Sequence, residues 1–208
     1  MFIWQPACPT SRLPVFDLII SFKEHAVTPK MLSTLLATLC LVSASLVHAA
    51  TPRDPYSHFF EDSFGDYAEE LERAREEGKK GVLLFFEMDE CPFCHRMKST
   101  VLNQPEVQDY YRAHFLCFSI DIEGDVDIVD FDGNELSQKR FATETNRVRA
   151  TPVFAFYDLQ GEQVVRYTGA TSGVQEFIWL GEFVAGEHYR NERFTRYKRA
   201  RKKQQSAQ

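Results

Sequence analysis

A continuous apolar run at residues 82–86 leads into a pair of cysteines, and this feature constrains the fold more than any other in the sequence. The run Val-Leu-Leu-Phe-Phe does not alternate with polar residues, which is typical of a strand covered on both faces. The cysteines follow in Cys91-Pro92-Phe93-Cys94, where Pro92 suits the first turn of a helix. Two cysteines with two residues between them, at a strand-to-helix junction, indicate a dithiol that cycles through a disulfide.

His95 keeps a second interpretation of these cysteines open. Read with His95, they form Cys-x-x-Cys-His, the pattern by which haem is covalently attached in c-type cytochromes. That hypothesis predicts His95 as an axial ligand and a mostly helical chain around the porphyrin. The strand before the motif and the alternating α/β order of the remaining chain favour the dithiol instead.

Hydrophobic periodicity predicts an α/β fold with a central mixed β-sheet and helices on both faces. Strands are expected at residues 82–86, 115–120, 153–157 and 163–167, the last two as a hairpin. Helices are expected at residues 60–74, 97–111 (interrupted at Pro105), 141–148 and 174–184. The acidic stretch at residues 123–136 contains Asp-Gly-Asn and predicts a surface hairpin or loop.

An uncharged apolar segment at residues 32–47 predicts export, because small residues follow it that suit signal peptidase. We expect residues 1–30 to be an over-extended N-terminus and residues 31–50 a cleaved signal peptide; a retained anchor is the less favoured alternative, since the run is short for a membrane span. The mature chain then holds one domain at residues 51–188. Its three remaining cysteines argue against a framework of structural disulfides.

Basic charge is concentrated at the C-terminus. Residues 190–203 hold eight Lys or Arg and one Glu, whereas the formal net charge of the whole chain is -6, so the rest of the chain carries -13. We expect residues 189–208 to form a basic tail, a solvated and frayed helix. Weak contact of this tail with an anionic membrane or an acidic partner is the alternative. Nucleic acid is not an expected partner of an exported chain.

The position of the cysteines predicts their roles. Cys91 lies at the amino end of the helix, where free N–H groups and the helix dipole favour a thiolate, so Cys91 is expected to be the nucleophile. Cys94, one turn further on, is expected to resolve the mixed disulfide. Phe93 is expected to contact the substrate. No cofactor beyond the redox-active disulfide Cys91–Cys94 is expected, and Cys117, within an apolar strand, is expected to be a buried small hydrophobe.

Three further residues are candidates for the same site. Thr151-Pro152 precedes a strand, and a cis bond there would place a backbone edge beside Cys91 for pairing with an extended substrate. Glu87 ends the strand before the cysteines and could exchange a proton with Cys94 during resolution. An exposed, chemically idle Glu87 and an ordinary strand-initiating proline are the alternatives.

The sequence resembles the thioredoxin superfamily over about residues 59–185. Residues 84–97, 129–133 and 150–154 look like the exported thioredoxin-related proteins of the SoxW type, found with sulfur-oxidation systems. The resemblance implies a thioredoxin-like fold and a periplasmic thiol:disulfide oxidoreductase that acts on protein disulfides and is kept reduced by a membrane-embedded thiol carrier. It also implies that Cys91 and Cys94 are the redox pair and Pro152 the cis-proline.

The chain departs from cytosolic thioredoxin at the proton-transfer position. Phe85 stands where that family usually has a buried Asp, which is why Glu87 enters as a substitute. A Pro-Phe dipeptide between the cysteines also resembles glutaredoxin, but no Gly-Gly pair follows Thr151-Pro152 where a glutathione site is expected. A disulfide oxidase or isomerase, and a binding module with an idle disulfide, remain alternative functions.

Overall fold

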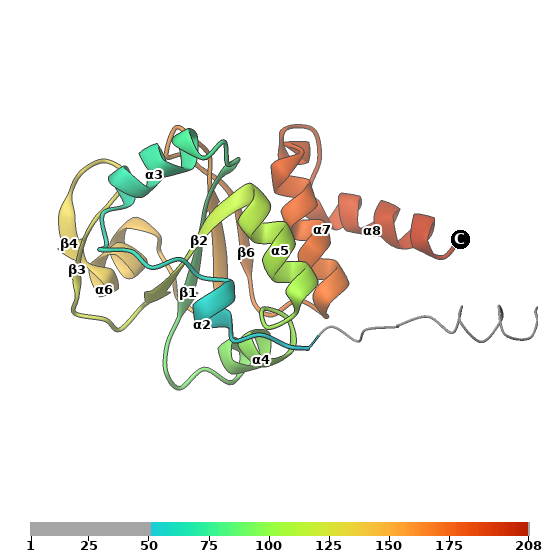
Figure 1. Cartoon of the computed structure of the whole chain (residues 1–208), viewed down its shortest axis with the longest axis horizontal. Coiled ribbons are helices and arrows are strands. Elements are labelled where there is room, and N and C mark those ends of the chain that lie inside the picture. The colour runs from blue at the N-terminus through green and yellow to red at the C-terminus, as the bar shows by residue number, and fades with distance from the viewer. Residues whose placement is uncertain (1–50, 208) are drawn as a thin grey trace, which may run out of the picture. The chain divides into compact units, whose positions relative to one another are not determined.

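The computed structural model describes residues 51–207. The predicted over-extension at residues 1–30 and the predicted signal peptide at residues 31–50 lie outside the described residues. Figure 1 shows the arrangement of the elements. The helical elements are α2 Pro55–His58, α3 Tyr67–Glu76, α4 Pro92–Thr100, α5 Pro105–His114, α6 Gln138–Arg140, the π-helical turn Phe141–Thr145, α7 Val174–Ala185, the 3-10 turn His188–Arg190 and α8 Phe194–Gln205.

The centre of the domain is a four-stranded mixed sheet in the order β2-β1-β5-β6, which confirms the predicted fold class. Strand β1 (Gly81–Glu87) pairs in parallel with β2 (Phe115–Asp121), and β5 (Val153–Tyr157) runs antiparallel to both β1 and β6 (Gln163–Thr168). Every residue of the two central strands, β1 and β5, is buried. The two central strands are therefore covered on both faces, as the continuous apolar run predicts.

Side chains of β1 alternate between two cores, one on each face of the sheet. Leu83 and Phe85 face a core built with α4, α5 and α7, which also contains both cysteines of the motif. Leu84 and Phe86 face a second core built with α3 and the turn that begins at Phe141. In Figure 1, α5 and α7 accordingly lie on one side of the sheet and α3 on the other. Glu87 lies two residues after Phe85 in β1, so its side chain is on the same face of the sheet, the face that packs against the core with both cysteines.

The first predicted helix is wrong at its beginning. Phe60 and Phe64 continue the helical spacing in the sequence, but α3 begins only at Tyr67. Gly65 has a φ of 88°, in the left-handed region, and the Asp66 side chain accepts a hydrogen bond of 2.9 Å from the Glu69 N–H, so the helix is capped there. Phe60 is nevertheless buried, because the preceding segment packs it on the core.

The helix predicted at residues 141–148 is also shorter than expected. The structure has one turn, α6, followed by the π-helical turn Phe141–Thr145. The acidic stretch does form a surface hairpin, of strands β3 (Asp127–Val129) and β4 (Glu135–Ser137). In its turn, the Asp130 carboxylate accepts hydrogen bonds of 2.9 Å from the backbone N–H groups of Asp132 and Asn134. Asp130 therefore acts as a turn-forming acid.

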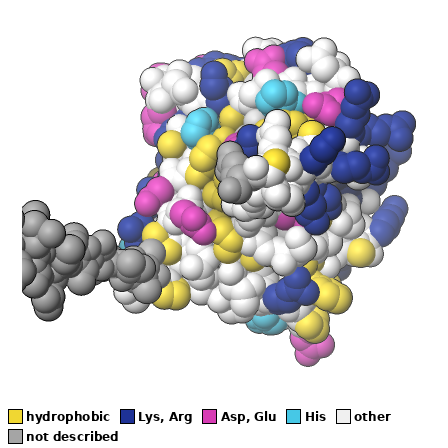
Figure 2. All heavy atoms as spheres, turned by 90° about the vertical axis from the view of Figure 1, so that its right-hand side faces the viewer, with side chains coloured by type: hydrophobic (Ala, Val, Ile, Leu, Met, Phe, Trp, Pro, Cys, Tyr) yellow, Lys and Arg dark blue, Asp and Glu magenta, His cyan; other side chains and the backbone are white. Residues whose placement is uncertain are grey.

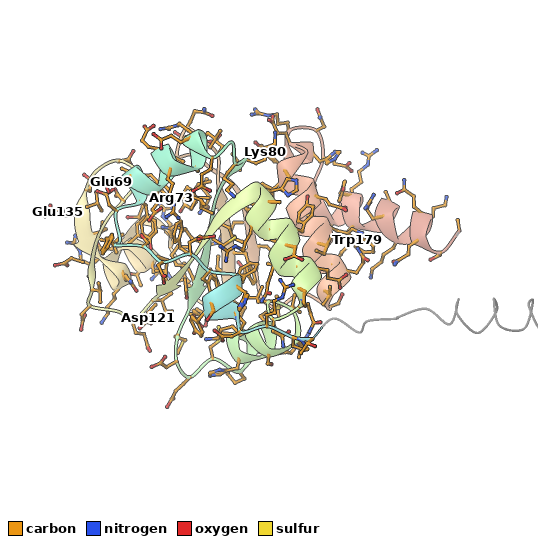
Figure 3. The ribbon with its side chains drawn as sticks, viewed as in Figure 1. Glu69, Arg73, Lys80, Asp121, Glu135 and Trp179 are labelled. Atoms are coloured by element: carbon orange, nitrogen blue, oxygen red, sulfur yellow. A yellow bond between two sulfur atoms is a disulfide. The ribbon has the colours of Figure 1, made fainter. Side chains whose placement is uncertain are left out.

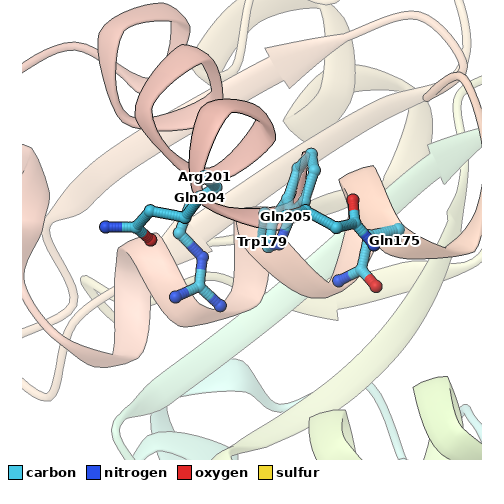
Figure 4. A pocket seen from close by; sticks show the side chains of 5 residues that line it. All are labelled: Gln175, Trp179, Arg201, Gln204 and Gln205. Atoms are coloured by element: carbon cyan, nitrogen blue, oxygen red, sulfur yellow. The ribbon is translucent and has the colours of Figure 1, made fainter. Parts of the chain in front are cut away.

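The expectation of a frayed, solvated tail does not hold for residues 194–205. Helix α8 packs across α7: Tyr197 is only 9% exposed and belongs to the cysteine-side core. Two ion pairs fix the crossing, Lys198 Nζ to Glu176 Oε1 at 2.7 Å and Arg201 to Glu182 Oε2 at 2.6 Å. Trp179 lies on α7 at this side of the domain (Figure 3). A pocket of about 210 Å³ is lined by residues of both helices, shown in Figure 4: Gln175, Trp179, Arg201, Gln204 and Gln205.

Candidate functional site

The two cysteines of the motif form a disulfide at the amino end of α4. Cys91 is the residue that caps the helix, and its Sγ accepts a hydrogen bond of 3.1 Å from the Cys94 N–H. Pro92 occupies the first turn, where its missing N–H leaves no bond unmade. Once the disulfide is reduced, the free N–H groups of this turn and the helix dipole favour a thiolate at Cys91.

Burial distinguishes the two sulfur-bearing residues from their neighbour. Cys94 is fully buried and Cys91 is 4% exposed, whereas Phe93 between them is 57% exposed. The exposed ring of Phe93 is an apolar surface directly beside the disulfide, and a bound protein substrate can bury it. The contact of Phe93 with substrate stays a prediction.

The Thr151–Pro152 peptide bond is cis. Pro152 directly precedes β5, and Val153 pairs with Phe86 in the antiparallel register of β5 and β1. Pro152 therefore lies at the carboxyl end of β1, the same edge of the sheet from which the cysteine loop leaves. Thr151 is half-buried and Pro152 is buried. The structure thus brings together the two segments that the sequence identifies, residues 91–94 and 151–152, at one end of the sheet.

Glu87 is not an exposed strand end: it is 8% exposed and lies in a polar cluster. Its Oε2 is 2.5 Å from Lys98 Nζ, and its Oε1 accepts hydrogen bonds from the hydroxyls of Ser119, at 2.5 Å, and Tyr56, at 3.3 Å. Lys98 also lies 5.0 Å from the centre of the Tyr56 ring. We call Glu87, Lys98, Tyr56 and Ser119 the Glu87 cluster.

The Glu87 cluster is linked to the redox pair through α4. Lys98 follows Cys94 by four residues, so the two side chains share a helix face one turn apart. Burial lowers the pKa of Lys98, but hydrogen bonds with Glu87 and Tyr56 outweigh it, and the pKa is raised above its ordinary value. The ammonium is therefore charged at neutral pH, and it pairs with the Glu87 carboxylate from a position one helical turn after Cys94.

Sequence reasoning missed Tyr56 and Lys98. The spacing of Lys98 from Cys94 is a signal that could have identified it, whereas Tyr56 comes from α2, a segment with no motif of its own. Both residues line a groove of about 660 Å³ beside α4, together with Asp89 and His95. The groove forms a hollow along α4, between that helix and the segment that contains α2.

Phe85, at the position of β1 where the resemblance to thioredoxin implies an acid, is part of the apolar core. It is fully buried, and its ring lies 4.9 Å from that of Phe154 and 5.6 Å from that of Phe60. Such packing leaves no polar group at that position of β1. Glu87, two residues further on and on the same face, is the buried acid of β1.

His95 is exposed. Its Nε2 lies 2.8 Å from the carbonyl oxygen of Asp89. The haem hypothesis for Cys91, Cys94 and His95 predicts a mostly helical chain, and the structure has a four-stranded mixed sheet instead. The fold therefore differs from the one that the haem hypothesis predicts.

Cys117 lies on β2, is buried, and is not part of the disulfide. Burial raises the pKa of its thiol well above the ordinary value, so the reactive thiolate is not formed at neutral pH. We expect Cys117→Ala to keep the wild-type rate of disulfide exchange. The expected cost is about 1 kcal/mol of stability, measured by denaturant unfolding, because one buried sulfur is removed. Loss of exchange activity in a folded Cys117→Ala variant would assign this thiol a role.

A family model described as a thioredoxin-like domain matches residues 67–185, and the chain belongs to this family. A thioredoxin-fold protein from Helicobacter pylori has a similar structure, with a TM-score of 0.53 and 23% identity over 63% of this chain and 88% of that one. A thioredoxin from Thermus thermophilus is 25% identical, with a TM-score of 0.46, over 57% and 83% of the two chains. The structure described as the oxidoreductase DsbH is 19% identical, with a TM-score of 0.47, over 71% and 98%. No protein with a curated description matches the sequence.

Within residues 51–207, no helix is both long enough and apolar enough to cross a membrane.

Proposed function

We propose that this protein is a periplasmic thiol:disulfide oxidoreductase that reduces protein disulfides through Cys91 and Cys94. The observation that carries the proposal is the Cys91–Cys94 disulfide at the amino end of α4 in a thioredoxin-like domain. A buried pair of structural cysteines would need neither the helix end nor the exposed ring of Phe93 beside it. The periplasmic location is proposed from the predicted signal peptide at residues 31–50. A protein of the SoxW type is proposed from the resemblance of residues 84–97, 129–133 and 150–154.

The proposed reaction begins with the reduced protein. The Cys91 thiolate attacks one sulfur of a substrate disulfide, a mixed disulfide forms, and the other substrate sulfur leaves and takes up a proton. Cys94 then loses its proton and attacks Cys91 Sγ, which breaks the mixed disulfide. The substrate leaves with two thiols, and the two electrons it gained come from the Cys91–Cys94 pair, which is now oxidised. A thiol donor, in our proposal a membrane-embedded carrier, restores the dithiol.

Glu87 is the proposed acceptor of the Cys94 proton. It is an acid on the cysteine side of β1, and its partner Lys98 lies one turn from Cys94 on α4. The ion pair with Lys98 holds the carboxylate in place, and the hydroxyls of Tyr56 and Ser119 complete its hydrogen bonds. Proton transfer by a positioned group is worth roughly 10²–10⁴ in rate.

Substrate binding is proposed to use the backbone at Thr151–Pro152 and the ring of Phe93. An extended substrate segment can pair with a backbone edge at the end of the sheet, which gives affinity without demanding a particular sequence. Phe93 then covers apolar side chains of the substrate beside the sulfur that Cys91 attacks. Oxidation or isomerisation of disulfides would use the same residues. The direction of electron flow, from the cysteine pair to the substrate, is therefore a separate step of this proposal.

Catalysed reduction of insulin by dithiothreitol tests the proposed function. The protein is expected to accelerate precipitation of the insulin B chain at micromolar concentration. The Cys117→Ala variant should match the wild type, because that thiol is buried and the raised pKa keeps it protonated. An uncatalysed rate with the folded wild-type protein would contradict the proposal and favour a binding module with an idle disulfide.

A further inference from the structure

Helix α8 (Phe194–Gln205) lies beyond the residues that the family model matches, which end at residue 185. Its orientation on α7 is fixed by Tyr197, whose ring lies 5.4 Å from that of Phe183, and by the ion pairs of Lys198 and Arg201 with α7. The side chains that leave this packed face are therefore presented to solvent in a defined direction.

The face of α8 opposite α7 is basic. Successive residues of a helix are rotated by about 100°, so Arg196, Arg199 and Lys203 lie on the side away from Tyr197 and Arg201. All three are exposed. Two further exposed cations flank them, and we call the five residues the basic face: Arg193, Arg196, Arg199, Lys202 and Lys203. Figure 2 shows Lys and Arg side chains gathered on the side of the molecule that carries this helix.

The charge of the basic face is largely uncompensated. The acids on α7 beneath α8, Glu176 and Glu182, are paired with Lys198 and Arg201 on the packed side. Among the ion pairs of residues 51–207, the basic face takes part in one, between Arg196 and Glu192 at 3.7 Å, where the Arg196 side chain is 83% exposed. Lys198 and Arg201 thus hold α8 on the domain, whereas the cations of the basic face are exposed to solvent.

We infer that the basic face binds the surface of an anionic phospholipid membrane. An acidic protein is the competing partner, but tight protein interfaces depend on apolar or aromatic anchors buried at their centre. The aromatic residues of α8, Phe194 and Tyr197, are already packed against the domain. Long flexible cations on a convex helix, without an apolar anchor, suit a planar layer of headgroup phosphates.

The strongly acidic remainder of the chain does not prevent this contact. Electrostatic interactions in solution are screened within about 10 Å at moderate salt, so a membrane at the basic face senses that face rather than the whole molecule. In Figure 1, α8 projects at one side of the domain and α4 lies at its lower edge. A molecule docked through α8 therefore keeps Cys91 free for exchange at the membrane surface. This inference does not depend on the proposed function.

Co-sedimentation of the full-length protein with vesicles tests the inference. Vesicles of phosphatidylcholine with about a third phosphatidylglycerol are compared with pure phosphatidylcholine at about 0.1 M salt. The triple variant Arg196→Gln, Arg199→Gln, Lys203→Gln should bind the anionic vesicles roughly 100-fold more weakly than the wild type. The matched control, Lys80→Gln, Lys139→Gln, Arg147→Gln, removes the same charge from exposed positions elsewhere and should bind as the wild type does.

Each other outcome contradicts the inference. Equal weakening of both triple variants would assign binding to net charge, and equal binding of all proteins to both kinds of vesicle would assign it to the apolar N-terminal segment that they share. Binding of the wild type to polyglutamate but not to anionic vesicles would identify an acidic protein as the partner. Far-ultraviolet circular dichroism of the variants verifies that α8 remains folded.

Discussion

The Cys94→Ser variant is expected to accumulate a stable mixed disulfide through Cys91 and to lose turnover by roughly 10³-fold or more. Cys91 attacks the substrate normally in this variant, but the buried sulfur one turn away that should displace the substrate has been replaced by a hydroxyl. The adduct is measured on non-reducing gels, with mass spectrometry to locate the linked cysteine. Adducts should disappear when a reductant is added.

The matched variant Cys91→Ser should form no such adducts, although it also retains one cysteine of the pair. Cys94 is fully buried, so its sulfur is not presented to a protein substrate. Both variants replace one cysteine by serine. A difference in adduct formation between them therefore depends on which cysteine remains and not on the kind of substitution. Equal trapping through Cys94 in Cys91→Ser would show that the proposed nucleophile is wrong.

The second large effect is expected for Glu87→Gln, which should slow resolution of the mixed disulfide by roughly 10²-fold or more. Glutamine keeps the size of the side chain and can still accept a hydrogen bond from Ser119, but it cannot take a proton from Cys94. The measurement is the rate of substrate release from a preformed mixed disulfide as a function of pH. The rate of the variant should depend on hydroxide, whereas that of the wild type should level off.

Lys98→Gln separates proton transfer from structure. It removes the same ion pair but keeps the Glu87 carboxylate as a proton acceptor, with the hydrogen bonds from Tyr56 and Ser119 still available to position it. Since both variants break one partly buried pair, both should lose stability, by about 3 kcal/mol at most. Only Glu87→Gln should slow resolution strongly. Equal slowing by the two variants would assign the Glu87 cluster a purely structural role, and Glu90→Gln, at an exposed neighbouring acid, serves as the control for nearby charge.

The sheet and the position of the redox pair could be predicted because their signals are local. The run at residues 82–86 is continuous and apolar, and the cysteines and Thr151-Pro152 are short motifs at fixed points in the order of elements. The start of α3 could not be placed by periodicity. Phe60 is apolar because it packs on Phe85 from a non-helical segment, and such a tertiary contact imitates the spacing of a helix.

The partners of Glu87 and the docking of α8 depend on contacts between distant segments. Tyr56 and Ser119 lie 31 and 32 residues from Glu87 in the sequence, and they meet it only when α2 and β2 are assembled beside β1. In the C-terminal segment, charge dominates the composition and indicates a solvated tail. The few side chains that hold α8 on α7, among them Tyr197, are recognisable only when Glu176 and Glu182 are seen beneath them.

The equilibrium redox potential of the Cys91–Cys94 pair tests the central claim most directly. The folded protein is equilibrated with defined ratios of reduced and oxidised glutathione, and the fraction of oxidised pair is counted after thiol alkylation. A protein-disulfide reductase should have a potential below about -200 mV, because its dithiol must give up electrons to the substrate. A potential near about -120 mV, in the range of strong periplasmic oxidants, would contradict the account and assign the pair to disulfide formation.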